Sequence, residues 1–307
     1  MTSGMSSPKA LLPAAAAFFL ALSCSSCVTK RAADLLTVPR RATDAEHWER
    51  ETKLKPQRFE VQAKDGIMIS GYSLEPAAGT KRIGTAWLLH GLGNSKEQML
   101  PVARKLSAAG FRCVAWDSRG HGKTGGTRAT FGTKEVDDTL RVMAEARRMK
   151  GTPRREPEVI WGYSMGTAVA LQTLPHVSKV KAAVLLAPMS DLGGVMYHQA
   201  RNHYSGTLQP LVPVVRAKVN STAGFDPKNI RPVDCVKDTK CKLLLVHGDR
   251  DSTIPPWQSQ QILDACKPGQ GQRILLPGVG HGGVMWDLPE KTGSEAIEFL
   301  LQQSGAR

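Results

Sequence analysis

Ser164 lies at the centre of a Gly-x-Ser-x-Gly run that spans residues 162–166. A short apolar run at 159–161 precedes it, and residues 167–174 are compatible with a helix. A serine on a sharp strand-to-helix turn holds its hydroxyl out of the sheet, and the flanking glycines let strand and helix approach closely. The N-terminus of the helix carries partial positive charge, which favours a developing oxyanion. The pattern therefore predicts a nucleophilic serine, with a plain glycine-rich turn as the alternative.

A serine hydroxyl is a weak nucleophile until a neutral imidazole removes its proton, and a carboxylate must orient the imidazole. His281 lies in a glycine-rich loop, and Asp251 follows the apolar run 243–246. The order serine, acid, histidine along the chain is known for such triads. We therefore expect Asp251 and His281 to complete the site. Asp249 and Asp191 stay open as alternatives for the acid, because each also follows an apolar run.

Short apolar runs alternate with amphipathic stretches along most of the chain. The expected strands are residues 58–63, 67–74, 83–89, 112–116, 159–161, 182–186, 243–246 and 272–276, and the first two flank the hairpin signal Asp65-Gly66. The expected helices are residues 97–109, 134–149, 165–174, 256–266 and 293–302. This alternation predicts an α/β fold with a mostly parallel sheet, helices on both faces and the reactive groups at the carboxyl ends of the strands.

Residues 192–240 interrupt the alternation, because they contain Tyr197, Tyr204 and several prolines but no clear strand. A structureless loop of this length would be unusual in a compact domain. We therefore expect a small cap inserted after the run 182–186, where it would roof an acyl pocket. The alternative is an ordinary helical excursion that fills an edge of the core.

The motifs together resemble the α/β-hydrolase family, and the resemblance extends over nearly the whole domain expected at residues 57–307. His90-Gly91-Leu92-Gly93 is similar to the family's oxyanion loop, which implies that the backbone N–H groups of Leu92 and Met165 bind the oxyanion. The run Asp-Ser-Arg-Gly-His-Gly at 117–122 is also similar to a family loop, which implies that His90 and His121 are structural. The branch most resembled contains monoacylglycerol lipases, lysophospholipases and serine aminopeptidases.

The resemblance implies a serine hydrolase that cleaves carboxylic esters, of lipids or small acyl groups, through an acyl-serine intermediate. Such chemistry requires no metal, nucleotide or other cofactor. Peptidase and acyltransferase activity stay open, because both proceed through the same intermediate. A third hypothesis is a catalytically silent binding lipoprotein of the cell envelope, which a fluorophosphonate probe would fail to label.

The N-terminus predicts an export signal. Lys9 precedes an apolar run at 10–22, which is shorter than the roughly 20 residues that a membrane-spanning helix needs. The run ends in Ser23-Cys24, which resembles a bacterial lipobox and implies a lipid on Cys24. We expect a signal peptide over 1–23, a charged, patternless lipid-anchor tether over 24–56, and peripheral attachment to a membrane in the cell envelope. An ordinary secretory signal and a retained helix are the alternatives, which palmitate labelling distinguishes.

The chain is basic, with 41 Lys and Arg against 27 Asp and Glu and a net charge of +14. Such a charge favours anionic surfaces. The basic residues are spread along the chain, and no paired metal-binding cysteines or interleaved aromatic residues accompany them. Nucleic-acid binding is therefore not expected.

The cysteines show neither metal-ligand spacing nor a catalytic context. Cys113 lies in an apolar segment, where a buried free thiol is expected. Cys235 and Cys241 flank a polar loop and could close a small ring, which an exported chain permits. Spacing alone leaves that disulfide open.

Overall fold

The computed structural model describes residues 27–39, 50, 52–149, 156–203 and 208–305. Its strands are β1 (Gln57–Gln62), β2 (Met68–Leu74), β3 (Gly84–Leu89), β4 (Phe111–Trp116), β5 (Glu158–Tyr163), β6 (Val180–Leu186), β7 (Lys242–Gly248) and β8 (Gly271–Leu276). They form one eight-stranded sheet in the order β1-β2-β4-β3-β5-β6-β7-β8. β2 pairs antiparallel with β1 and β4, and the other neighbours are parallel. The predicted mostly parallel sheet is confirmed.

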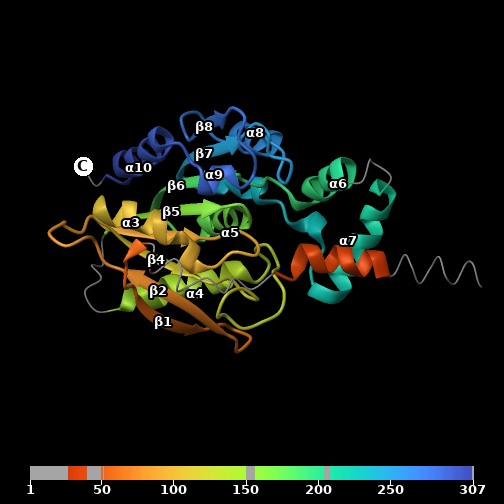
Figure 1. Cartoon of the computed structure of the whole chain (residues 1–307), viewed down its shortest axis with the longest axis horizontal. Helices are drawn as coiled ribbons and strands as arrows, with labels where there is room; N and C mark the ends of the chain where they lie inside the picture. The colour runs from red at the N-terminus through yellow and green to blue at the C-terminus, as the bar shows by residue number, and fades with distance from the viewer. Residues whose placement is uncertain (1–26, 40–49, 51, 150–155, 204–207, 306–307) are drawn as a thin grey trace, which may run out of the picture.

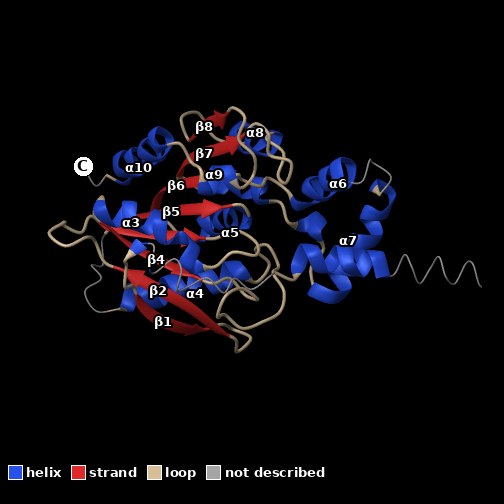
Figure 2. Cartoon of the chain, in the orientation of Figure 1, coloured by secondary structure: helices blue, strands red, loops and turns tan. Residues whose placement is uncertain are grey.

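Helices lie on both faces of this sheet (Figures 1 and 2). One face carries α3 (Leu100–Ala108), which follows the short η1 (Lys96–Met99), together with α9 (Gly283–Trp286) and α10 (Glu290–Ser304). The other face carries α4 (Glu135–Arg148), α5 (Met165–Thr173), which runs into η2 (Leu174–His176), and α8 (Trp257–Asp264). The layered α/β fold expected from the sequence is therefore present.

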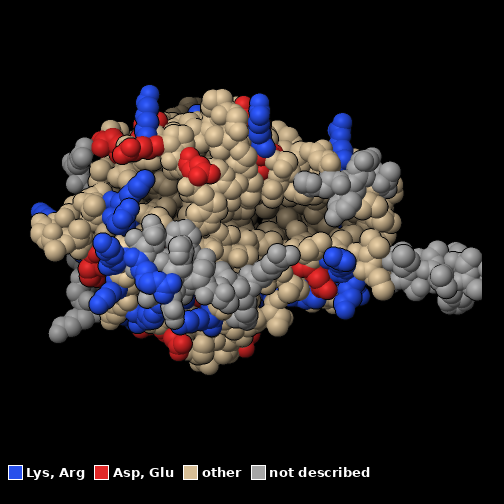
Figure 3. All heavy atoms as spheres, in the orientation of Figure 1, with Lys and Arg blue, Asp and Glu red and all other residues tan. Residues whose placement is uncertain are grey.

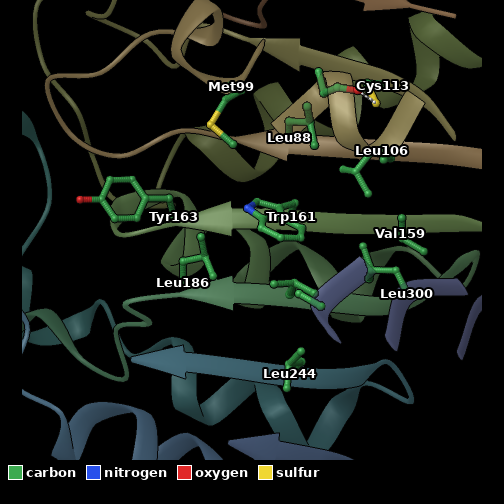
Figure 4. Packing of buried hydrophobic residues seen from close by; sticks show 14 of the residues in the cluster. Leu88, Met99, Leu106, Cys113, Val159, Trp161, Tyr163, Leu186, Leu244 and Leu300 are labelled. Carbon is green, nitrogen blue, oxygen red and sulfur yellow. Dashed lines mark hydrogen bonds between the residues drawn. The ribbon is translucent and has the colours of Figure 1, made fainter. Parts of the chain in front are cut away.

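Successive strand residues feed two separate cores, because side chains alternate between the faces of a sheet. On one face, Leu88 and Trp161 pack in a cluster with Leu300 of α10 (Figure 4). Their chain neighbours Trp87 and Ile160 point to the opposite face and join the second cluster. The central strands are buried on both sides, which explains why they read as continuous apolar runs.

Residues 192–240, which we call the cap, follow β6 and precede β7. The described part of the cap contains α6 (Leu192–His203), η3 (Gln209–Leu211), α7 (Val212–Ala223), η4 (Pro227–Asn229) and η5 (Pro232–Asp238), and no strand. Its two ends are tied together, because the Leu192 N–H donates to the Ile230 carbonyl at 3.0 Å and the Val233 N–H to the Ser190 carbonyl at 3.1 Å. The cap therefore leaves and rejoins the sheet at one place.

Residues 27–37 form a helix, which we call the N-terminal helix, where the sequence predicted a patternless tether. Ala33 and Thr37 on this helix are fully buried, and Leu36 packs against apolar side chains of the cap. Figure 1 shows the helix in red beside the cap. This part of the predicted tether is a packed element because contacts distant in the sequence stabilise it.

The predicted signal peptide at 1–23 and the lipid attachment at Cys24 lie outside the described residues and stay predictions. Among the helices that the structure describes, none combines the length and apolarity that a membrane crossing requires. Cys235 and Cys241 are both free thiols, so the ring that their spacing allowed is not formed. Cys241 is buried in the same core cluster as Val236 of η5, and burial raises the pKa of its thiol.

Candidate active site

Ser164 lies at the turn between β5 and α5, with φ +52° and ψ −119°. This left-handed backbone region is one that residues other than glycine rarely adopt. The Ser164 N–H donates to the Leu186 carbonyl at 2.9 Å, which holds the turn against β6. Gly166 is required two residues on, because a Cβ there would collide with the Leu89 carbonyl oxygen of β3. The turn places the serine at the carboxyl edge of the sheet.

Three side chains from three separate loops form one hydrogen-bonded chain. The Ser164 Oγ lies 2.9 Å from the Nε2 of His281, and the Nδ1 of His281 lies 2.7 Å from the Oδ2 of Asp251. An ionised carboxylate can only accept hydrogen bonds, so Nδ1 carries the imidazole proton. Nε2 is then free to accept the serine proton. The arrangement can therefore activate the hydroxyl as a nucleophile.

Asp251 is buried, yet its environment keeps it ionised. Burial by itself would raise the pKa of this carboxyl, but hydrogen bonds from His247 and His281 hold the pKa well below its usual range. Its second oxygen, Oδ1, accepts the backbone N–H groups of Thr253 at 2.9 Å and Ile254 at 2.8 Å. These contacts fix the orientation of the carboxylate toward the imidazole.

The two alternative acids make other contacts. Asp249 Oδ1 accepts the Gly278 N–H at 2.7 Å and so supports the loop that carries His281. Asp191 Oδ1 accepts the Gly194 N–H at 2.5 Å at the start of α6. Among the three carboxylates, only that of Asp251 is within hydrogen-bonding distance of the imidazole.

The two residues predicted to supply oxyanion N–H groups lie near Ser164. Met165 begins α5, and Leu92 belongs to the loop after β3; both line the same cavity as Ser164. Neither N–H donates to an acceptor among the described residues. The loop lies close to the serine, because a Cβ on Gly91 would come within 3.2 Å of the Ser164 Cβ. Leu92 and Met165, which the sequence predicted for an oxyanion site, therefore line the cavity together with Ser164, and their role there stays a prediction.

His90 and His121 join the loop after β3 to the loop after β4 by hydrogen bonds. His121 Nε2 accepts the Gly93 N–H at 3.0 Å, and His90 Nε2 accepts the Ser118 N–H at 2.9 Å. A nitrogen that accepts a hydrogen bond must be unprotonated. Burial is the main cause that lowers the pKa of His90 to about 4 and that of His121 to about 3. Both imidazoles are neutral structural acceptors.

The free energy of unfolding should therefore fall as the pH decreases from 6.5 toward 4. Because both pKa values are below the ordinary 6.5 in the folded state, the unfolded chain binds more protons in this window. Each histidine contributes a slope of at most about 1.4 kcal/mol per pH unit. Urea denaturation of His121→Gln protein, which keeps an acceptor without a titrating group, should show a shallower slope. Equal slopes would mean that the imidazole is not held neutral.

A family model described as "Serine aminopeptidase, S33" matches residues 80–240, just over half of the chain. The chain belongs to this α/β-hydrolase family. The matched residues include the loop after β3, the serine turn and the cap, whereas Asp251 and His281 lie beyond them.

Several curated proteins and solved structures are similar to this hydrolase. The uncharacterized protein YfhR of Escherichia coli (strain K12) is 26% identical over 73% of each chain. Lysophosphatidylserine lipase ABHD12 of Bos taurus is 23% identical over 60% of this chain and 46% of its own length. The Pyrococcus furiosus esterase Pf2001 has a TM-score of 0.71 at 22% identity, covering 88% of this chain and 99% of that one. The structural likeness supports the same fold.

An apolar cavity of about 430 Å³ opens at the serine of the hydrolase. Ser164 and His281 form one end, α6 and α7 of the cap line one side, and the N-terminal helix lines another. Figure 3 shows the surface hollowed between the sheet domain and the cap, with uncharged residues around the hollow. Among the described residues, no group of three or more His, Cys, Asp or Glu side chains is placed to hold a metal ion.

The sequence did not reveal two features of the site. The Tyr163 ring lies 5.4 Å from the His281 ring, and its hydroxyl donates to the His281 carbonyl at 3.3 Å. Tyr163 occupies a variable position of the serine motif, which carries no local signal for this contact. The N-terminal helix is the second feature, because charged residues separate its few apolar residues along the sequence.

Proposed function

We propose that this hydrolase cleaves carboxylic esters, of lipids or small acyl groups, through an acyl-serine intermediate. The observation that carries the proposal is the hydrogen-bonded chain from Asp251 through His281 to Ser164. The serine and the imidazole at the end of this chain line an apolar cavity. Cavities of this size and lining are typical of sites for small apolar ligands.

In the proposed reaction, Ser164 Oγ bonds to the ester carbonyl carbon while His281 Nε2 takes the hydroxyl proton. The carbonyl oxygen becomes an oxyanion, which the N–H groups of Leu92 and Met165 stabilise. The imidazolium, held by Asp251, then gives its proton to the leaving alkoxide as the carbon–oxygen bond breaks. A water molecule, deprotonated by His281, then attacks the acyl carbon, and the imidazolium returns this proton to Ser164 Oγ as the acyl–oxygen bond breaks, which releases the acid and free serine.

The lining of the cavity favours acyl esters over peptides with a free amino group. A peptidase that recognises an N-terminal ammonium needs an acceptor, usually a carboxylate, within its substrate site. The described residues that line the cavity include no Asp or Glu; Gln199 and Thr253 are among its few polar members. The names of the related lysophosphatidylserine lipase and esterase support the same substrate class.

A panel of p-nitrophenyl esters from acetate to palmitate, run beside aminoacyl p-nitroanilides, tests the proposal. We expect turnover of the esters, with the anilides slower by at least about 100-fold, and release of free acid as the product. Turnover of the anilides alone would overturn the proposal. Transfer of the acyl group to added glycerol in preference to water would identify an acyltransferase instead.

A further inference from the structure

The N-terminal helix presents a continuous apolar stripe to the cavity at the serine. Val28, Ala32, Leu35 and Leu36 all line that cavity. Their spacing of four, three and one residues places them on one side of a helix. The stripe faces α6 and α7 of the cap across the cavity. The cavity therefore has a wall that comes from outside the predicted hydrolase domain at 57–307.

This wall is fixed in place by the loop between β4 and α4. Arg128 donates from Nη1 to the Thr37 Oγ1 at 2.6 Å and from Nη2 to the Asp34 Oδ1 at 2.7 Å. The Ala129 N–H donates to the Thr37 carbonyl at 2.7 Å. Thr37 is fully buried, whereas the Arg128–Asp34 ion pair is partly exposed. The helix is held as part of the folded body by two guanidinium bonds to different residues and by a backbone bond.

Packing against the cap does not account for all of the stripe. Leu36 is packed against apolar side chains, but Leu35 is 62% exposed and Val28 is 43% exposed. Large apolar side chains that line a cavity and remain this exposed would gain stabilisation if an apolar ligand covered them. An acyl chain that extends from Ser164 through the cavity has the chemistry to cover them.

We propose that the N-terminal helix is the specificity-determining wall of the acyl site, and that Ala32 and Leu36 set the preference for acyl-chain length. The proposal rests on the proposed ester hydrolysis for its substrate. The wall acts on the acyl chain beyond the carbonyl group, while the reacting atoms remain with Ser164 and His281. Its contribution should consequently grow with acyl-chain length and vanish for the shortest esters.

Two opposite changes in the wall test this role in the full chain. Leu36→Ala removes apolar contact, and Ala32→Phe fills the cavity. We expect each to lower kcat/KM for a dodecanoate ester about tenfold, because single methylene changes in apolar pockets have effects of this order. Hydrolysis of an acetate ester should change less than about twofold in both variants. Val38→Ala is the matched control, because Val38 is an exposed apolar residue at the end of the same helix but does not line this cavity.

Binding of dodecanoate, measured by calorimetry, gives a readout that does not require turnover. The proposal expects Leu36→Ala and Ala32→Phe to weaken this binding about tenfold and Val38→Ala to leave it unchanged. If the two variants affect the acetate and dodecanoate esters equally, or affect neither, the proposal that the N-terminal helix sets acyl preference is wrong. A different result is that the variants weaken dodecanoate binding as expected while the wild-type protein hydrolyses no ester. That result would support the role of the N-terminal helix and contradict only the proposed reaction.

Discussion

Replacing Ser164 with alanine is expected to lower ester turnover by roughly 10⁶-fold and to abolish labelling by a fluorophosphonate probe. In the proposed reaction the Oγ forms the only covalent bond to the acyl group, and it is the hydroxyl that lies 2.9 Å from the Nε2 of His281. Alanine can keep the backbone of the turn, because the Ser164 N–H bond to Leu186 does not involve the side chain. Folding should therefore be unaffected.

The measurement compares kcat for a butyrate ester, probe labelling and thermal unfolding in the wild type and in Ser164→Ala protein. Ser252→Ala is a suitable control, since Ser252 is exposed and directly follows Asp251. The control should retain activity and labelling. Labelling that persists in Ser164→Ala protein would show that another residue is the nucleophile. If Ser164→Ala greatly lowers the melting temperature, the same comparison is made with Ser164→Gly.

The substitution Asp251→Asn is expected to reduce kcat by about 10⁴-fold, with little change in KM. An asparagine can still accept the Thr253 and Ile254 N–H groups through its oxygen, so the loop should keep its shape. Its amide, however, presents donors to the imidazole where the carboxylate oxygen accepted the Nδ1 proton. The imidazole then favours the tautomer with its proton on Nε2, which cannot accept the proton of Ser164.

Asp249→Asn and Asp191→Asn serve as matched controls for this prediction. Asp249 supports the Gly278 N–H, and Asp191 supports the start of α6, so each should lower kcat by less than about tenfold. The same butyrate ester and the same thermal unfolding measurement apply to all three proteins. A large loss of kcat in either control, together with a mild effect of Asp251→Asn, would show that the control residue is the acid of the triad.

The sheet and the serine turn could be predicted because their signals are local. The central parallel strands are apolar runs bounded by turn residues, and the Gly-x-Ser-x-Gly run lies directly between a strand and a helix. The acid was harder to choose, since Asp251 and Asp249 both follow β7 within three residues. Only the pairing of β7 with β8, which sets Gly248 opposite Leu276, brings the His281 loop over one of them.

The N-terminal helix could not be predicted from its own residues. Lys30, Arg31 and Asp34 separate its apolar residues along the sequence, so the segment resembles a solvated linker. The contact that fixes it joins Thr37 to Arg128, 91 residues away in the sequence. A short helix gains little from propensity alone and depends on such packing. Local pattern therefore carries no information about whether this segment is ordered.

If residues 27–37 form the wall of the acyl site as proposed, acyl preference is free to differ between relatives without any change in the matched region. The wall at 27–37 lies outside the matched region at 80–240, and it meets that region mainly through Arg128 and the cap. A short N-terminal segment of this kind can be exchanged between relatives while the sheet and the serine turn stay the same. Exchange of residues 27–37 alone would then alter the acyl-chain range that we propose for this hydrolase.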